Sequence, residues 1–516
     1  MTDPRVRFLT GVEDADVADV LRLLDEPTVR IAGEVTEWRH QVLLYGLVDL
    51  LGRVFPRLDI AIDQDTPCAA GLPPGPLTVG QRLRATRERS PLQAAEPAET
   101  TFTVQIGADG TDADMYVDAS EWQSYVGPTP SHLVPPRRDT AVGPLSAACR
   151  AASRLSAMLL APVFEAPPLA DAVYSSALTL RSSGTPIDDP DPGEPGELDG
   201  LLVGGGSVGG AFAYALAYEP HLVGHLSVCD PQHLDMTNPY RAILATATAA
   251  AREEAKAEEV KRALAVHHGL LVDAHVGTIT TWEADHSDPP MLPLLLVAVD
   301  SRESRELIQD ALPLEVLNAA VGNDLVVISG HRTGSGPCMC CLHMPQVLDA
   351  TAIKNRLIAD GTGLDQRLVN EARVRRTPLD DQHLRHVERH RGLRPGALAR
   401  YAGLTLDELY EAEILYGETR ITTPAGTAVA VAAPFVTALA GVLLAGEALK
   451  RSMPAAAPYA LGPNGPAIQY RENPYAPQHA YLDAHIPRSA TCLCRSVRRL
   501  RLTADLHGLN LTTLTT

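Results

Sequence analysis

The sequence predicts an α/β protein whose main domain is a doubly wound, Rossmann-like sheet, preceded by a second α/β domain. Apolar strands alternate with helical stretches in both halves of the chain. In the second half, the apolar run 201–203 leads through a glycine loop into a helix, and the next strand ends in an acid, Asp230. At 516 residues, the chain is too long for one ordinary core, so we expect several domains.

The first half, residues 1–181, has its own strand–helix alternation. We expect the strands at 29–32, 58–62, 101–106 and 115–117, an amphipathic helix at 38–55 and a further helix at 143–160. The Ala-rich helix at 143–160 is similar to the later segment 432–440, which suggests an ancient duplication. The segment Gly33-Glu34-Val35-Thr36 replaces a glycine loop, so this half could not seat a phosphate. We therefore interpret residues 1–181 as a degenerate, inactive copy of the second half. The alternative is an unrelated α/β recognition domain.

A polar run rich in Pro, Asp and Gly, residues 182–200, is interpreted as a linker between the halves. Within the first half, Asp118, Ser120 and Trp122 at a strand end are expected either to face the second half or to cap a turn. The linker leads into the main domain, which we place at residues 201–475.

The glycine loop of the main domain contains Gly204, Gly206 and Gly209. A strand that enters a helix through such a turn presents backbone N–H groups and a helix N-terminus to a phosphate. The following strand, 222–228, leads to Asp230, where dinucleotide sites place an acid for a ribose hydroxyl. The alternative is a tight turn that binds no ligand.

The residues after Asp230 favour ATP over NAD. Asn238 and Arg241 supply an amide and a guanidinium suited to polyphosphate. Lys256 opens a helical run at 256–264, and the strand 294–299 is followed by Asp300 and Arg305. An acid at the carboxyl end of a parallel strand is well placed to hold Mg²⁺ beside a nucleotide. The alternatives are a solvated helix face for Lys256 and surface ion pairs for Arg241 and Asp300.

From about 201 to 450, the chain resembles the ThiF superfamily of adenylating enzymes. The resemblance implies that the glycine loop at 204–209 is the ATP loop, that Asp230 is the ribose acid, and that Asn238 and Arg241 form the S-N-x-x-R pair. It also implies that Lys256 is the phosphate lysine and that Asp300 with Arg305 is the magnesium-binding segment. Two positions depart from the family pattern, because Ala242 replaces a Gln and residues 253–255 replace Gly-Lys-Pro.

The resemblance implies ATP-dependent adenylation of the C-terminal carboxylate of a ubiquitin-like protein, with ATP and Mg²⁺ as cofactors. A conjugating enzyme would then supply an acceptor cysteine, and a homodimer is conceivable within this family. The alternatives are adenylation or leader-peptide binding of a ribosomal peptide in natural-product synthesis, and a NAD-dependent oxidoreductase. Arg241, Lys256 and Asp300 are the expected catalytic residues.

Two cysteine pairs far apart in sequence predict a structural Zn²⁺ that attaches a C-terminal tail, residues 476–516, to the main domain. The ligands are expected to be Cys338, Cys341, Cys492 and Cys494, with Cys340 as a possible substitute. Buried free thiols or a disulfide are the alternatives. The ThiF enzymes that form thioesters use a cysteine in the segment between the pairs, and none lies there. We therefore expect the reaction to stop at the adenylate or a partner to supply the thiol; the alternative is that Cys340 or a hydroxyl is the nucleophile. Cys229 is expected to be a core residue.

Other features of the sequence limit the class of protein to which the chain can belong. A net charge of −19 argues against nucleic acid or an anionic membrane as the main partner, and we expect a cytoplasmic location. The uncharged stretch 424–446 is interpreted as a buried helix and not a membrane span. An insertion at 345–420 is expected to be helical, either a solvated helical pair or a basic docking surface. Within it, His386 and His390 have metal-ligand spacing without an evident third ligand.

Overall fold

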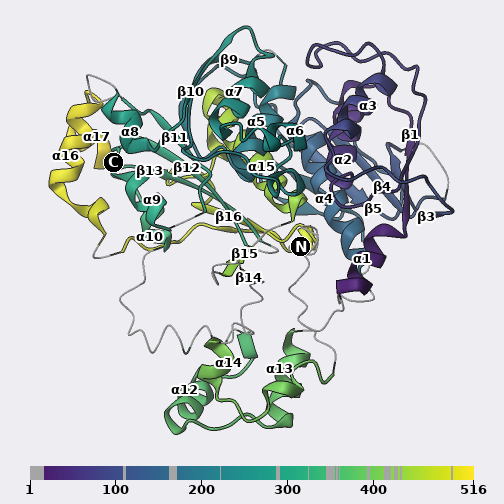
Figure 1. Cartoon of the computed structure of the whole chain (residues 1–516). Helices are drawn as coiled ribbons and strands as arrows, with labels where there is room; N and C mark the ends of the chain where they lie inside the picture. Colours follow the sequence, from purple (N-terminus) through teal and green to yellow (C-terminus); the bar gives the residue numbers. More distant parts are fainter. Residues whose placement is uncertain are drawn as a thin grey trace. The chain divides into compact units, whose positions relative to one another are not determined.

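The computed structural model describes residues 17–108, 112–161, 171–220, 222–285, 291–300, 302–322, 325–343, 355, 358–359, 361–391, 395–411, 420–422, 428–430, 433–489 and 492–515. The chain divides into two compact units. One contains 1–20, 160–166 and 345–431, and the other contains 21–159, 167–344 and 432–516. The second unit holds both predicted halves, so the two sheets can be described together (Figure 1).

The first half forms a seven-stranded sheet in the order β2-β1-β3-β4-β5-β6-β7. Its elements are α1 (Val17–Asp25), β1 (Thr28–Gly33), α2 (Trp38–Leu51), β2 (Leu58–Ala61), α3 (Val79–Glu88), β3 (Thr100–Ile106), β4 (Met115–Ser120), β5 (Gln123–Gly127), α4 (Val142–Leu159), β6 (Val173–Ser176) and β7 (Ser182–Ser183). Strands β1 to β4 are parallel, and β5, β6 and β7 continue the sheet antiparallel. The expected strands and helices of this half are confirmed to within a few residues.

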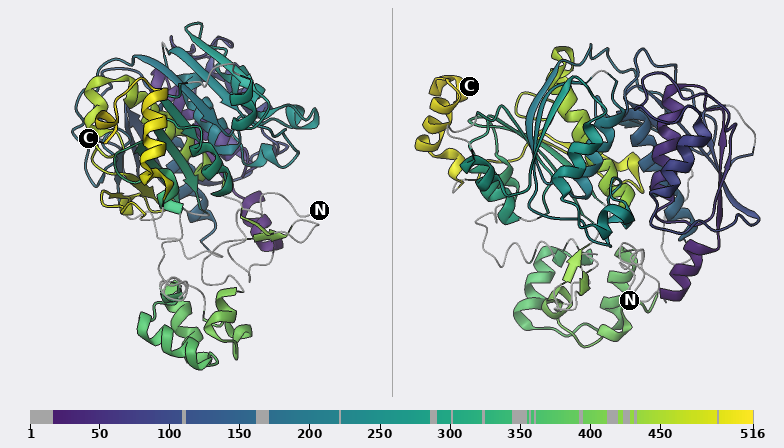
Figure 2. Two further views of the ribbon diagram at one scale, coloured as in Figure 1. Left: turned by 90° about the vertical axis from the view of Figure 1, so that its left-hand side faces the viewer. Right: turned by 45° about the horizontal axis from the view of Figure 1, so that its top comes forward.

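The second half forms an eight-stranded sheet in the order β10-β9-β8-β11-β12-β13-β16-β17. Its elements before the insertion are β8 (Glu197–Val203), α5 (Ser207–Tyr218), β9 (Val223–Cys229), η2 (Asn238–Tyr240), α6 (Ala247–Ala251), α7 (Lys256–Leu264), β10 (Leu270–His275), α8 (Ile279–Ala284), β11 (Leu294–Val297), α9 (Arg302–Gln309), β12 (Glu315–Val321), β13 (Val326–Arg332) and α10 (Met339–His343). Those after it are α15 (Pro434–Ser452), η4 (Pro454–Tyr459), β16 (Gln469–Glu472), η5 (Pro477–His479), β17 (Tyr481–Asp483), η6 (Leu493–Arg495), α16 (Val497–Leu506) and α17 (Leu511–Thr515). Helix α16 lies at the C-terminal end of α9, because Arg499 donates to Gln309 O and to the Asp310 carboxylate. The two C-terminal helices are the yellow helices next to the mark for the C-terminus in Figure 2.

The two sheets share one topology. In both, the first strand is an inner strand with the second strand on one side of it, and on the other side strands follow in chain order. The first four strands are parallel to their neighbours, and the last three are antiparallel. The second sheet differs by one added edge strand, β10. Helix α4 therefore corresponds to α15 by its place in the order, which is the relation suggested by their similar sequences.

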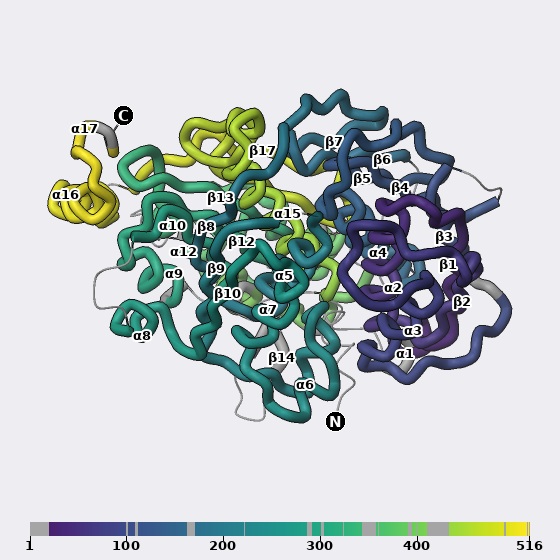
Figure 3. The backbone as a smooth tube through the Cα atoms, turned by 90° about the horizontal axis from the view of Figure 1, so that it is seen from above, coloured from purple at the N-terminus to yellow at the C-terminus, as the bar shows by residue number. Residues whose placement is uncertain are grey.

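Four helices pack in a layer between the sheets. Helix α15 packs against α5 of its own half and against α4 of the first half, and α4 packs against α2 (Figure 3). Every residue of α2 is buried, so the expected amphipathic helix is wrong in that respect. The reason is that α2 contacts α3, α4 and β4, which leaves it no face in solvent.

Asp118, Ser120 and Trp122, predicted either to face the second half or to cap a turn, make different contacts. The Trp122 ring packs against α15 at Gly446 and so faces the second half. Asp118 instead lies within its own half, where one carboxylate oxygen is 3.0 Å from His40 Nε2. The Ser120 hydroxyl donates to Val134 O over 2.6 Å.

The predicted linker, 182–200, is partly built into the sheets. Its first two residues form β7 and its last four belong to β8. Between them, Ile187 packs beside a cluster of three buried tyrosines, and its carbonyl accepts from Gln123 Nε2 over 2.6 Å. The polar composition gave no sign of this apolar contact or of the strand pairing.

The insertion forms helices with a core of their own: α12 (Gln366–Arg375), α13 (Asp381–Arg391), η3 (Ala399–Tyr401) and α14 (Leu406–Glu411), together with a hairpin of β14 (Arg420–Thr422) and β15 (Ala428–Ala430). Helix α14 begins with a capping box, since Glu408 N donates to Thr405 Oγ1 and Thr405 N donates to the Glu408 carboxylate. The His386 ring contacts the Gly363 carbonyl, and His386 and His390 belong to no cluster of potential metal ligands among the described residues.

Residues 434–446 of the uncharged stretch form a buried helix, as expected. The expectation is wrong for residues 428–430, which form the strand β15 because they pair with β14. Residues 424–427 and 431–432 lie outside the described residues. In the described part of the chain, we find no helix with both the length and the apolar character needed to cross a bilayer.

Candidate nucleotide site and four-cysteine cluster

The glycine loop joins β8 to α5 at the carboxyl edge of the second sheet. Gly204 has a φ of +100°, and a Cβ added there would lie 2.5 Å from Ala298 O. A Cβ on Gly209 would lie 1.8 Å from Gly204 O, so both positions need glycine for the loop to close. A Cβ on Gly206 would meet no atom within 4 Å. The loop is therefore packed against β11 and α5, while Gly206, at the start of the helix, is open to a ligand.

Asp230 follows β9 and holds the loop. Its side chain is 5% exposed, and one carboxylate oxygen accepts from Gly205 N over 2.6 Å. The other accepts from Gln232 N over 2.7 Å. A carboxylate offers about four lone-pair sites, so these two bonds leave acceptor capacity for a hydroxyl. The ribose role of Asp230 stays a prediction, but the residue lies where that role requires it.

Lys256 is the first residue of α7 and lies over the glycine loop, because a Cβ on Gly205 would be 3.1 Å from Lys256 O. Its ammonium donates to Gln232 Oε1 over 2.6 Å. Burial lowers the pKa of Lys256, and the carboxylates of Asp230 and Asp300 act in the opposite direction.

The Arg241 guanidinium and the Asp235 carboxylate also act on the pKa of Lys256. The structure thus brings Asp230, Arg241 and Asp300 close enough to act on the charge of Lys256, although the sequence spreads the four residues over 71 positions. The Lys256 ammonium donates to a neutral amide, and among the described residues no carboxylate accepts a hydrogen bond from it. That arrangement suits an anionic ligand.

The segment that follows Asp230 places Asn238 and Arg241 on a short 3-10 turn, η2. The Asn238 side chain is 2% exposed and lies beside the Asp235 carboxylate. Burial raises the pKa of Asp235, but hydrogen bonds from Thr237 and Asn238 outweigh burial and lower it. The Arg241 side chain is half-buried, and its carbonyl accepts from Thr437 Oγ1 of α15 over 3.2 Å.

Asp300 lies beyond the carboxyl end of β11 and is exposed. Arg305 is buried, and its guanidinium donates to the carbonyls of Val299 and Asp300 and to Asn318 Oδ1. Burial lowers the pKa of Arg305, and the Asp300 charge raises it again in part. Arg305 therefore holds the backbone that carries Asp300, and its donors point into the protein.

Two residues of the site escaped the sequence reasoning. Gln232 supplies the amide that binds Lys256, and its place two residues after the strand-end acid was the available signal. Thr437 anchors the Arg241 carbonyl from a helix almost 200 residues later, and no local pattern marks it.

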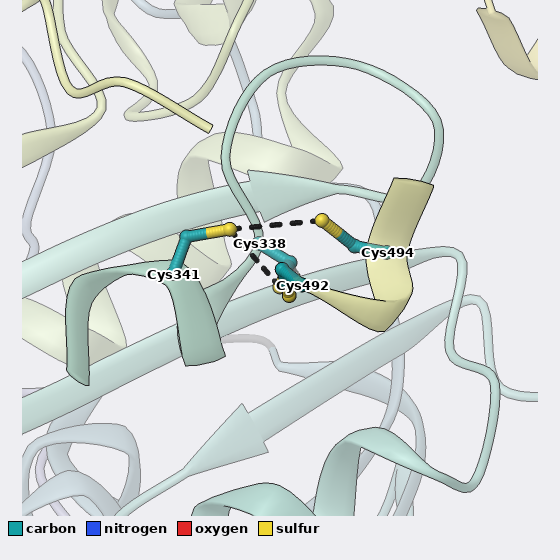
Figure 4. Close-up of side chains that lie close together, drawn as sticks. All are labelled: Cys338, Cys341, Cys492 and Cys494. Atoms are coloured by element: carbon teal, nitrogen blue, oxygen red, sulfur yellow. Dashed lines mark hydrogen bonds between the residues drawn. The ribbon is translucent and has the colours of Figure 1, made fainter. Parts of the chain in front are cut away.

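The four cysteines predicted as zinc ligands lie together (Figure 4). Their sulfur atoms are all within 4.8 Å of one another. The Cys338 sulfur is 3.7 Å from that of Cys341 and 3.4 Å from that of Cys492, and the Cys341 and Cys494 sulfurs are 3.6 Å apart. Four thiolates arranged tetrahedrally at a Zn–S distance of about 2.3 Å would be separated by about 3.8 Å. The cluster fits a tetrahedral Zn²⁺ and connects the turn before α10 to η6 of the C-terminal tail.

Two further cysteines can be assigned from their surroundings. Cys340 lies outside the cluster, with its sulfur 3.8 Å from Arg305 O, so it does not substitute for a ligand. Cys229 is fully buried and donates to Gly277 O over 3.0 Å. Burial raises the pKa of Cys229 to about 12, which keeps it a thiol at neutral pH. The expectation that Cys229 is a core residue is confirmed.

No protein-family model matches the chain. The chain is 28% identical over 343 residues to the uncharacterized protein y4jF of Sinorhizobium fredii (strain NBRC 101917 / NGR234), a match covering 62% of this chain and 60% of that protein. It is similar to the microcin C7 biosynthetic enzyme MccB in complex with N-formylated MccA, with 15% identity and a TM-score of 0.33 over 57% of this chain and 66% of that one. For E. coli MccB with ATP the values are 14% and 0.32, over 58% and 67%. The chain thus spans 60% of the length of its curated relative.

Proposed function

We propose that this chain is an ATP-dependent adenylyltransferase of the ThiF type. The proposal rests on the charged side chains that act on Lys256 beside the glycine loop. Of the three predicted loop glycines, only Gly206, at the start of the helix, has free space where a side chain would be. A dinucleotide site needs the loop and an acid, but it has no need of an added lysine and arginine. A triphosphate requires such cations, since it carries several negative charges in a small volume.

The proposed reaction is transfer of AMP to a carboxylate. A carboxylate oxygen attacks the α-phosphorus of ATP, an acyl–phosphate bond forms, and the bond between the α-phosphorus and the bridging oxygen breaks to release pyrophosphate. No base is needed, because a C-terminal carboxylate is already ionised at pH 7. Arg241 and Lys256 would offset the charge on the phosphates as the bridging oxygen leaves, and the loop amides would hold the phosphate chain in line.

Asp300 is the residue that would hold Mg²⁺. Its carboxylate is exposed at the carboxyl edge of the sheet and has no ion-pair partner within the described residues, so an oxygen ligand is free there. Mg²⁺ would supply charge neutralisation on the phosphates. Arg305 keeps the Asp300 backbone in place through its two carbonyl contacts, so we assign it a positioning role and not a contact with the nucleotide.

The proposed substrate is the C-terminal carboxylate of a polypeptide, either a ubiquitin-like protein or a ribosomally made peptide. The cysteine pattern bears on the next step. Cys229 is a buried thiol, four cysteines form the cluster, and no cysteine lies between 341 and 492. We therefore propose that the acyl adenylate is the product of this chain and that another protein supplies the acceptor nucleophile.

The first half is proposed to be a degenerate copy of the adenylation domain. Its support is the common strand order, in which only β10 lacks a counterpart. At the place of the glycine loop, the first half has Gly33 followed by larger residues, and the helix α2 begins at Glu37, whose carboxylate would repel a phosphate. We also propose that Zn²⁺ occupies the four-cysteine cluster and attaches the tail to the second half.

The test is pyrophosphate exchange into ATP, measured with candidate carriers encoded beside the gene. Binding of MgATP and of NAD is measured in parallel by calorimetry. We expect MgATP binding, no NAD binding, and exchange that depends on a carrier with a free C-terminus. Asp300→Ala should reduce exchange about 100-fold or more, whereas Asp273→Ala, an exposed strand carboxylate paired with His225, should not. Binding of NAD in place of ATP, or full exchange by Asp300→Ala, would refute the proposal.

A further inference from the structure

Arg53 and Arg150 are the two largest fully buried polar side chains in the described residues, and Arg53 lies just beyond the end of α2 in the first half. Burying a guanidinium costs free energy unless the charge is paired and its N–H groups are hydrogen-bonded. Burial lowers the pKa of Arg53, and the Asp49 carboxylate raises it again in part. Since the first half has no glycine loop, this buried cation has no nucleotide of its own half to bind.

The Arg53 guanidinium instead reaches into the second half and binds three backbone carbonyls. Nη1 donates to Pro239 O and, over 3.2 Å, to Ala245 O, and Nη2 donates to Ile243 O over 2.5 Å. All three acceptors belong to residues 239–245, the segment that carries Arg241 and follows Asn238. Most of this segment lies outside regular helix and strand, so its carbonyls need partners from elsewhere.

A second layer of the first half fixes the Arg53 side chain. Nη2 also donates to Asp49 Oδ1 over 3.2 Å, and the other Asp49 oxygen accepts from Arg89. The Arg89 guanidinium lies over the ring of Tyr214 in α5, at 5.9 Å from its centroid. The two arginines and the aspartate therefore form one buried network, anchored at both the nucleotide segment and the helix that follows the glycine loop.

From these contacts, we propose that Arg53 is a positioning residue for the nucleotide site, through which the inactive half sets the path of residues 239–245 and hence the place of Asn238 and Arg241. The inference rests on the proposed function. It gives the first half a definite task, which is to complete the geometry of a site that lies wholly on the second half. A guanidinium suits this task because its planar fork can bind several carbonyls at fixed angles, which an ammonium cannot.

The experiment compares Arg53→Lys with Arg150→Lys in the full chain. Arg150 is the matched control, because it is also a buried arginine of the first half that bonds to the second half. Its partner, Glu472, is on β16, four strands from β8 in the sheet. We expect Arg53→Lys to raise the KM for MgATP about tenfold or more, with a smaller change in kcat, and Arg150→Lys to leave the KM near its wild-type value.

Two further measurements separate positioning from general damage. If Arg53 acts through Arg241, Arg241→Met should weaken MgATP binding much less in the Arg53→Lys background than in the wild type. Hydrogen exchange of the amides at 240–245, measured without nucleotide, should speed up in Arg53→Lys and not in Arg150→Lys. If Arg53→Lys does not fold, Asp49→Asn loosens the same network with Arg53 present and should raise the same KM.

The outcomes distinguish this inference from the proposed function. A wild-type chain that binds no MgATP would refute the proposed function, and the exchange rates at 240–245 would still test the positioning role. Wild-type MgATP binding with unchanged KM and unchanged exchange rates in a folded Arg53→Lys variant would overturn the inference. Fully additive effects of the Arg53 and Arg241 substitutions would overturn it as well.

Discussion

Alanine substitutions at three neighbouring glycines should separate the glycine that shapes the nucleotide loop from the one that faces a ligand. At Gly209, an added Cβ would lie 1.8 Å from Gly204 O. At Gly206 it would meet no atom within 4 Å, and at Gly210 it would lie 3.8 Å from a Leu244 methyl. The three positions span five residues of one loop and helix. They therefore differ in local contacts and little else.

The magnitudes follow from these distances. A carbon and an oxygen in van der Waals contact are about 3.2 Å apart, so Gly209→Ala creates an overlap of more than about 1 Å between two backbone segments. Overpacking costs about 1–3 kcal/mol, and the upper end applies because neither segment is a flexible side-chain tip. Gly206→Ala should change the free energy of unfolding by less than about 1 kcal/mol. Gly210→Ala lies inside α5 and should stabilise it by about 0.5–1 kcal/mol.

The assay combines urea unfolding with calorimetric titration of MgATP. Gly209→Ala should unfold at clearly lower urea. Gly206→Ala should unfold like the wild type but bind MgATP about tenfold more weakly, because the new methyl group stands where phosphate must approach the helix amides. Gly210→Ala should keep the affinity for MgATP and unfold at slightly higher urea than the wild type. Equal stability of Gly209→Ala and Gly206→Ala would refute the loop geometry, and unchanged affinity of Gly206→Ala would refute the phosphate position.

Three other predictions concern the metal, a buried acid and the contact between halves. Metal analysis should find one equivalent of zinc that is lost on chelation or in Cys492→Ser, and the C-terminal tail should then be cut more readily by proteases. Cys340→Ser should keep the zinc, and a wild-type protein without metal would count against the site. Burial raises the pKa of Glu219 from 4.5 to about 7, so about 3 kcal/mol of unfolding free energy present below pH 4.5 is lost as the pH rises through 7. Glu219→Gln should therefore have a higher Tm than the wild type at pH 8 and an equal Tm at pH 4.5; a Tm difference that does not change with pH would be contrary evidence. Arg150→Met should lower the free energy of unfolding by about 3–5 kcal/mol, because it leaves the Glu472 carboxylate buried and unpaired. The double variant with Glu472→Met should lose less than Arg150→Met alone, and additive losses in urea unfolding would disprove the coupling.

Local sequence determined the elements that bear the candidate site. The boundaries of α7 agree with the predicted run 256–264, and β8, β9 and β11 lie within a few residues of their expected places. The positions of Gly204 and Gly209 were readable because a strand that enters a helix through a tight turn has no room for side chains there. The cysteine pairs were readable for a similar reason, since a tetrahedral metal site needs ligands at short spacings. The catalytic roles of Arg241, Lys256 and Asp300 stay predictions.

The tertiary structure alone decided how the halves cooperate. The common strand order, the burial of α2 on all sides and the packing of Ile187 result from contacts between segments far apart in the chain, which leave no local pattern. Arg53 shows this most clearly, because an arginine after a helix resembles a solvated cation in the sequence, yet it binds carbonyls almost 200 residues away. The physical reason is that backbone carbonyls look alike in every sequence, so only the folded chain shows which of them need a donor.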